Sequence, residues 1–284
     1  MSNHYMRSVL FVPANKPGML HNSYLFGADA IIYDLEDAIS IDQKDAARIL
    51  LDESFNFFKK TNIVRIVRIN PLDSPFFYKD IEVIKKHDID YIMLPKADVG
   101  SVKALEKEIK DTNIKIISLI ESAYSLFDLS NILTTSKLVE GMLFGAEDFS
   151  LDMQIERTKQ SDEILMARQN IALTCKALNK FCIDTPFTDV NDEDALRIDT
   201  HKVLAYGFNS KSCIHPNQVR IVNEVFTPTK EKIEDSLEII RLAKEAKENG
   251  LGVFAYKGKM VDAPVINRAK NTLENAKKAG VKYE

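Results

Sequence analysis

The chain has 284 residues, of which 45% are hydrophobic and 28% charged, and its formal net charge is −4. This mildly acidic balance excludes the basic surface that nucleic-acid-binding proteins present. Three cysteines without a CxxC motif predict buried, reduced thiols. No stretch reaches the ~18 apolar residues of a membrane span, and the N-terminus lacks the apolar segment of a signal peptide. We therefore expect a soluble, cytoplasmic protein with neither a nucleic-acid nor a membrane partner.

Short apolar runs recur along the first three quarters of the chain, bounded by turn residues and separated by helical patterns. Runs of this length are typical of buried parallel strands. They predict eight strands, near residues 8–12, 30–33, 63–69, 91–94, 114–120, 141–144, 181–183 and 207–214.

Helical periodicity between these runs is clearest over residues 42–58, 101–110 and 163–179, with Ser101 as the expected N-cap of the second helix. After residue 227 no further strand is predicted. Residues 230–249 indicate a long charged helix that Gly250 ends, and a final helix is expected from about Pro264.

Alternation of eight strands with helices predicts the α/β class, as a TIM (β/α)₈ barrel with a C-terminal helical extension. An open doubly wound sheet is the alternative. We expect residues 1–226 to form the barrel and residues 227–284 the extension, which packs on the barrel or on a neighbouring subunit.

Acidic residues follow three of the predicted strands. Asp34, Glu36 and Asp37 end the second run, Glu121 the fifth, and Asp148 follows the sixth. The carboxyl ends of parallel strands form the ligand-binding face of such folds, so these carboxylates converge. Gathered carboxylates without matching cations are costly unless a metal or substrate compensates, which predicts a Mg²⁺ site.

Within this group, Glu121 and Asp148 are the candidate metal ligands, with helix capping as the alternative for Glu121. Glu36 and Asp37 are candidates for acid/base work or for a solvated loop. Asp34 alternates with them and is expected to point away from the site.

Basic residues near the same strand ends are candidate substrate ligands. Arg68 ends the third run and could clamp a carboxylate or pair with a local Asp. Lys96 closes the fourth run, where a charged partner of the nearby acids is favoured over a Schiff-base lysine. Arg7, Asn15 and Lys16 surround the first run and could bind the phosphates of a large cofactor, with simple surface charge as the alternative. No glycine-rich phosphate loop is present.

The motifs together are similar to those of the citrate lyase β-subunit group of the aldolase superfamily, which also contains malyl-CoA lyases. The resemblance covers nearly the whole chain. It is carried by the segments RSVLFVP (7–13), ADAIIYDLEDA (28–38), VRIN (67–70), LPK (94–96), IES (120–122), GAEDF (145–149) and GKMVDAPV (258–265).

This resemblance implies a (β/α)₈ barrel that assembles as trimers or hexamers. It implies Mg²⁺ held by Glu121 and Asp148, with Arg68 on a keto-acid carboxylate. It also implies that Asp262 acts in the active site of a neighbouring subunit. From the sequence around it alone, Asp262 would be an N-cap.

The resulting hypothesis is a Mg²⁺-dependent carbon–carbon lyase that cleaves a citryl thioester to oxaloacetate and an acetyl thioester. Catalysis is assigned to Asp262, Glu36 and Arg68, and substrate binding to Arg68, Asn15, Lys16 and Lys96. The expected partners are an acyl carrier protein or CoA and the α and γ subunits of a citrate lyase. The alternatives are a stand-alone malyl-CoA or citramalyl-CoA lyase or thioesterase, and an inactive scaffold subunit.

Overall fold

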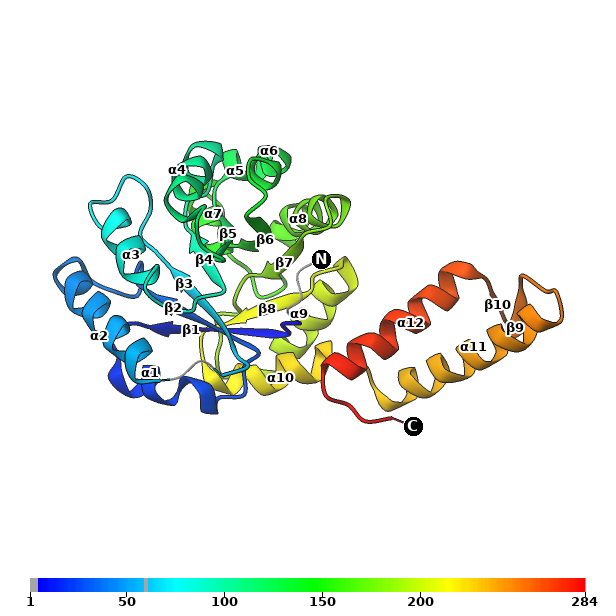
Figure 1. The fold of residues 1–284 in the computed structure, drawn as a ribbon. Helices are drawn as coiled ribbons and strands as arrows, with labels where there is room; N and C mark the ends of the chain where they lie inside the picture. Colours follow the sequence, from blue (N-terminus) through cyan, green and yellow to red (C-terminus); the bar gives the residue numbers. More distant parts are fainter. Residues whose placement is uncertain (1–4, 59–60, 284) are drawn as a thin grey trace. The chain divides into compact units, whose positions relative to one another are not determined.

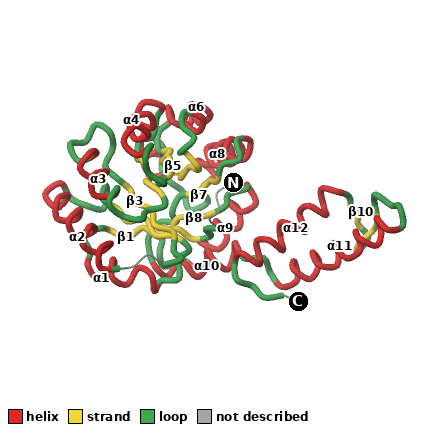
Figure 2. Tube along the Cα trace, viewed as in Figure 1, coloured by secondary structure: helices red, strands yellow, loops and turns green. Residues whose placement is uncertain are grey.

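The structure is a computed structural model that describes residues 5–58 and 61–283. Eight parallel strands close into a barrel in the order β1-β2-β3-β4-β5-β6-β7-β8, as predicted. Helices surround the strands (Figures 1 and 2). The strands are β1 Ser8–Pro13, β2 Ala30–Asp34, β3 Val64–Arg68, β4 Tyr91–Leu94, β5 Lys115–Ile120, β6 Val139–Phe144, β7 Phe181–Asp184 and β8 Ser210–Cys213.

The helices that accompany the strands are α1 Pro17–Asn22, α2 Lys44–Phe57, α3 Phe77–Ile84, α4 Val99–Ile109, α5 Ala123–Phe127, α6 Leu129–Thr134, α7 Ala146–Asp152, α8 Leu165–Ala177, α9 Glu193–Tyr206 and α10 Pro216–Phe226. Of these, α2, α4 and α8 begin and end within two residues of the predicted ranges 42–58, 101–110 and 163–179. The predicted N-cap of α4 was wrong. Asp98 caps this helix by accepting from Ser101 N–H at 2.6 Å, while Ser101 is the reciprocal partner in a capping box.

Apolar side chains fill the barrel axis. Every second residue of each strand points inward, and these positions hold Ala30 and Ile32 on β2, Val64 and Ile66 on β3, and Ile117 and Leu119 on β5. Continuing the alternation places Asp34, Arg68 and Glu121 at the next inward positions. The charged groups therefore lie on a dry, packed core, at the carboxyl ends of the strands.

Four charged side chains are buried on the outer side of β7 and β8. Arg168 donates to Asp184 at 2.9 Å and to Asp199 at 2.8 Å, and Lys211 donates to the same two carboxylates at 2.5 and 2.8 Å. Two cations and two anions cancel, so each buried charge has its partner. This network joins the barrel wall to α8 and α9.

The chain divides into two compact units, residues 1–224 and 225–284. The second unit contains α11 Lys230–Glu248 and α12 Ala263–Lys278, joined by a hairpin of β9 Phe254–Tyr256 and β10 Lys259–Val261. The expectation that no strand follows residue 227 was therefore wrong. Positive φ at Lys257 and Gly258 makes the two-residue turn of this hairpin.

No helix in the described part of the chain is long and apolar enough to cross a membrane.

Candidate active site

Asp34 is the centre of the hydrogen bonds at the carboxyl end of β2. Its side chain is 1% exposed and accepts from Arg68 at both oxygens, at 2.8 Å from Nε and 2.6 Å from Nη2. It also accepts from the backbone N–H groups of Glu36 and Ala38, at 2.9 and 3.1 Å. The expectation that Asp34 points away from the site was wrong. The expectation assumed that side chains alternate in direction from Asp34 through Glu36 and Asp37. β2 ends at Asp34, so this strand alternation does not continue into the turn that contains Glu36.

Arg68 is fixed by this bidentate pair, which leaves one edge of its guanidinium facing other acids. Nη1 lies 3.2 Å from Glu36 Oε2 and 3.3 Å from Asp37 Oδ2, and the group stacks 5.1 Å from the Phe11 ring centroid. An ion pair with a local Asp, the alternative raised from the sequence, is therefore present. The Nη1 edge remains in reach of an incoming carboxylate, because the Asp37 side chain is 62% exposed.

Glu36 is a buried carboxyl group at 6% exposure. Its Oε2 lies close to Arg68 but has no hydrogen bond. Burial raises its pKa to about 8, with Asp37, Glu121 and Asp34 adding to the rise and Arg68 opposing it. A carboxyl group with this pKa exchanges protons near neutral pH.

Glu121 follows β5 and lies beside the same acids. Burial, with a contribution from Asp148, raises its pKa to about 7, while a hydrogen bond from Lys96 N–H at 2.5 Å opposes the rise. Glu121 does not cap the helix after it, since Ser122 accepts from Ser125 N–H at 3.1 Å and does so instead. Its carboxylate is therefore available to a ligand.

Asp148 is exposed in the first turn of α7, and it lines an open cleft of about 440 Å³ together with Glu121 and Lys96. Gly145 keeps space open beside Glu121, because a methyl group there would lie 2.9 Å from Glu121 Cβ and 3.2 Å from its Oε2. Gly145 and Asp34 are site residues that the sequence analysis missed. Strand alternation, counted from the apolar core, would have found Asp34.

The two carboxylates fit a divalent ion that prefers oxygen ligands. Within residues 5–58 and 61–283, no group of three or more His, Cys, Asp or Glu side chains is arranged around a metal position. Mg²⁺ commonly binds through one or two carboxylates and completes its shell with water and substrate oxygens. Glu121 and Asp148 could therefore hold it.

Lys96 and Lys16 are both exposed, and the structure places them after β4 and β1 on the same face. The Lys96 backbone has a positive φ of 47°. Asn15 donates to Gln43 Oε1 at 2.5 Å, and its own Oδ1 is buried without a partner. Arg7 lies at the opposite end of β1, paired with Asp29 at 2.8 Å, so it cannot share a phosphate site with Lys16.

Asp262 is the N-cap of α12 and accepts from Val265 N–H at 3.2 Å. It belongs to the second compact unit. The capping interpretation of this residue therefore holds within that unit, and its catalytic role stays a prediction.

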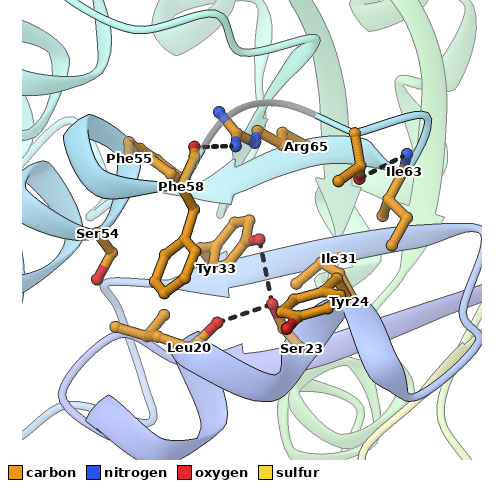
Figure 3. A pocket seen from close by; sticks show the side chains of 11 residues that line it. Leu20, Ser23, Tyr24, Ile31, Tyr33, Ser54, Phe55, Phe58, Ile63 and Arg65 are labelled. Carbon is orange, nitrogen blue, oxygen red and sulfur yellow. Dashed lines mark hydrogen bonds between the residues drawn. The ribbon is translucent and has the colours of Figure 1, made fainter.

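A second cavity, of about 140 Å³, lies on the outer side of β2 and β3 (Figure 3). Ile31 and Tyr33 form part of its wall, and several of its polar groups contact one another. Tyr33 and Ser23 hydroxyls lie 3.3 Å apart, and Arg65 donates to Phe58 O at 2.9 Å. Among the described residues, no carboxylate lines this cavity, and none of its lining residues lines the cleft beside Glu121.

Comparison with known proteins shows the family of this chain. A family model described as HpcH/HpaI aldolase/citrate lyase matches residues 7–216. The chain belongs to this family.

Curated relatives of the family extend over nearly the whole chain. It is 36% identical to the citrate lyase subunit beta of Leuconostoc mesenteroides, over 95% of this chain and 93% of that one. It is also 31% identical to the mitochondrial citramalyl-CoA lyase of Mus musculus, covering 95% and 87%. The chain is thus a carbon–carbon lyase of the HpcH/HpaI family.

A solved structure shares the fold. Protein CitE from Mycobacterium tuberculosis, in complex with magnesium, acetoacetate and coenzyme A, is 26% identical. It superposes with a TM-score of 0.83 over 98% of this chain and 100% of that one. The barrel predicted from the sequence is confirmed.

Proposed function

We propose that this chain is a Mg²⁺-dependent lyase that cleaves a 3-hydroxyacyl thioester, with citryl on an acyl carrier protein as the first candidate substrate. The products are oxaloacetate and an acetyl thioester. The observation that carries the proposal is the joint placement of two carboxyl groups with near-neutral pKa, Glu36 and Glu121, beside the fixed guanidinium of Arg68.

Glu121 and Asp148 would hold the metal. A bound Mg²⁺ would polarise the substrate's hydroxyl and adjacent carboxylate and lower the pKa of that hydroxyl. Magnesium is present in the relative from M. tuberculosis, which supports the choice of ion. The open space beside Gly145 supports the choice of Glu121.

Arg68 binds and orients the substrate. Asp34 holds the Nε and Nη2 edge, so a substrate carboxylate binds at the Nη1 edge and takes the place of the exposed Asp37 side chain. A guanidinium fixed before the substrate arrives loses little entropy on binding. Asn15 and Lys16 follow β1 and Lys96 follows β4, at the same end of the barrel as Arg68, and these three residues would contact the thioester and its carrier.

Glu36 then acts as the base. It takes the proton of the substrate hydroxyl, the carbon–carbon bond breaks, and its electrons pass to the thioester as an enolate. A proton delivered to the enolate carbon completes the acetyl thioester, and Asp262 of a neighbouring subunit is the proposed donor. The neighbour implies a homo-oligomer, a trimer or hexamer.

Asp148→Asn tests the metal assignment. The substitution removes one charge from an exposed helix residue, so we expect a native fold and a loss of turnover of about two orders of magnitude or more. Oxaloacetate release at saturating Mg²⁺ measures it. Near-normal kcat would exclude Asp148 as a ligand. Asp111→Asn, at an exposed position outside the cleft that Asp148 lines, is the control.

Citramalyl-CoA or malyl-CoA is the second candidate substrate, supported by the 31% identity to citramalyl-CoA lyase. Assays with each thioester, with Mg²⁺ and with chelator, separate the possibilities. Oxaloacetate from citryl thioesters supports the first proposal, in which the α and γ subunits of a citrate lyase are the expected partners. Pyruvate or glyoxylate instead indicates a stand-alone lyase, and no product from any thioester indicates a scaffold.

A further inference from the structure

Lys44 is the first residue of α2 and lies behind the acidic segment formed by residues 34–37. Its side chain is buried at 7% exposure. Its Nζ donates to the carbonyl oxygens of Leu35 at 2.9 Å and Glu36 at 2.7 Å. A lysine at a helix start would ordinarily be assigned to the solvent-exposed surface.

The surroundings of Lys44 do not favour a large contribution to the stability of the whole fold. Within residues 5–58 and 61–283 no carboxylate forms an ion pair with it, and burial lowers the pKa of its ammonium. A cation at a helix N-terminus is also opposed by the helix dipole. Arg48, one turn later, differs because it pairs with Asp80 at 2.9 Å and Asp45 at 2.6 Å.

The two carbonyls that Lys44 contacts do not depend on it for a donor. Leu35 O also accepts from Asn70 Nδ2 at 3.0 Å, and Glu36 O accepts from Ile39 N–H at 2.9 Å. What Lys44 alone adds is a fixed positive charge. The anions that act on it are Glu36, Asp34 and Asp37 of the site, together with Asp80.

We propose that Lys44 is a positioning residue of the active site. Its ammonium, anchored on the Leu35 and Glu36 carbonyls, holds the acidic segment against its own charge repulsion, with the Glu36 carboxyl group facing Arg68. The positioning follows from the contacts alone, whereas its effect on catalysis rests on the proposed function.

Three substitutions separate charge from hydrogen bonding and from packing. Lys44→Met keeps the apolar stem and removes the charge and the donors, Lys44→Gln keeps a donor without charge, and Lys44→Arg keeps both. Lys103→Met, at an exposed position of α4, is the control. Each variant is measured for steady-state kinetics, thermal unfolding, and amide hydrogen exchange of residues 34–39 against the strands.

We expect Lys44→Met to unfold at the same or a higher temperature than the parent, since a buried charge without an ion-pair partner is removed. Exchange of residues 34–39 rises about tenfold or more, with the strands unchanged. Turnover falls about tenfold or more in the Met and Gln variants, with KM within about twofold, and Lys44→Arg recovers much of it.

Unchanged exchange in Lys44→Met would overturn the positioning role. A joint loss of stability, strand protection and activity in all three variants would instead make Lys44 a packing residue and also overturn it. If the parent chain cleaves no thioester, the proposed function fails, while the exchange measurement still decides the role of Lys44.

Discussion

At the scale of single residues, the site depends on one buried carboxylate that organises its neighbours. Asp34 accepts two hydrogen bonds from Arg68. It also accepts one from each of two backbone N–H groups in the turn that follows β2. It is therefore tied both to the substrate-binding cation and to the backbone that presents Glu36.

Asp34→Asn should lower kcat/KM by about two to three orders of magnitude, because Arg68 loses a charged acceptor and its fixed orientation. Steady-state kinetics and thermal unfolding measure the effect. Asp29→Asn is the matched control, since Asp29 makes the same bidentate contact with Arg7 at the opposite end of β2. A similar loss of activity in both variants would contradict the assignment.

Two carboxyl groups of the site also predict a pH dependence of stability. The pKa of Glu36 is raised to about 8 and that of Glu121 to about 7, from an ordinary value of 4.5. The folded chain thus binds these protons more tightly than the unfolded chain does. Their stabilising contribution is complete below about pH 4.5 and is lost as the pH rises to between about 7 and 8.

Denaturant unfolding in the presence of chelator should therefore show that the free energy of unfolding falls between about pH 5 and 8.5. The fall should be smaller in the double variant Glu36→Gln/Glu121→Gln. Equal slopes for the variant and the parent would refute the assignment. Added Mg²⁺ should stabilise the parent more at the alkaline end, because a cation binds the ionised carboxylates.

At the scale of elements, most of the barrel could be predicted because buried parallel strands are apolar runs of limited length. All eight strands were predicted, and the main errors have local causes. Residues 207–209 were assigned to the last strand, yet Gly207 ends α9 in a left-handed conformation. The β9–β10 hairpin was missed because three-residue strands are too short to show an alternating pattern.

The candidate site was only partly predictable from the sequence. Strand ends indicate which face a carboxylate occupies, so Glu36, Arg68, Glu121 and Asp148 were correctly placed on one face. Burial of Lys44 and the clearance at Gly145 depend on contacts between elements distant in sequence. No local pattern carries that information.

Two glycines, one in strand β6 and one just after it, offer a test that separates the site from the barrel core beneath it. Gly145→Ala should place a methyl group against Glu121 and reduce Mg²⁺ affinity and turnover while keeping most stability. Gly141→Ala, lower in the same barrel wall, would overlap the Phe181 ring and should cost about 1–3 kcal/mol in stability. Calorimetric Mg²⁺ titration and denaturant unfolding distinguish them. Unchanged Mg²⁺ affinity in Gly145→Ala would count against the proposed ion position.

At the scale of the whole molecule, the proposed role of Asp262 requires two chains. Asp262→Asn removes the acid but keeps a good N-cap for α12, so the fold of the second unit should persist. The Asp262→Asn chain and the Asp148→Asn chain, each with a different tag, can be expressed together. Their hybrid oligomers should recover activity, because some sites then combine an intact Asp148 from one chain with an intact Asp262 from the other.

Thioester cleavage by tandem-purified hybrids measures this recovery, and each variant purified alone provides the baseline. Hybrids that contain both tags but remain as inactive as the parents would rule out catalysis across subunits. Activity of Asp262→Asn alone at the parental rate would remove Asp262 from the mechanism altogether.

The packed apolar axis beneath Arg68 and Glu121 has a consequence for substrate entry and product release. Within the described residues this packed core closes the barrel axis from below, so substrate and both products pass through the end of the barrel that carries the acidic site. Two products that share an exit must depart in sequence, and whichever leaves last sets the occupancy of the enzyme between turnovers. A tightly bound keto acid would then restrain cleavage simply by remaining, without any separate regulatory site.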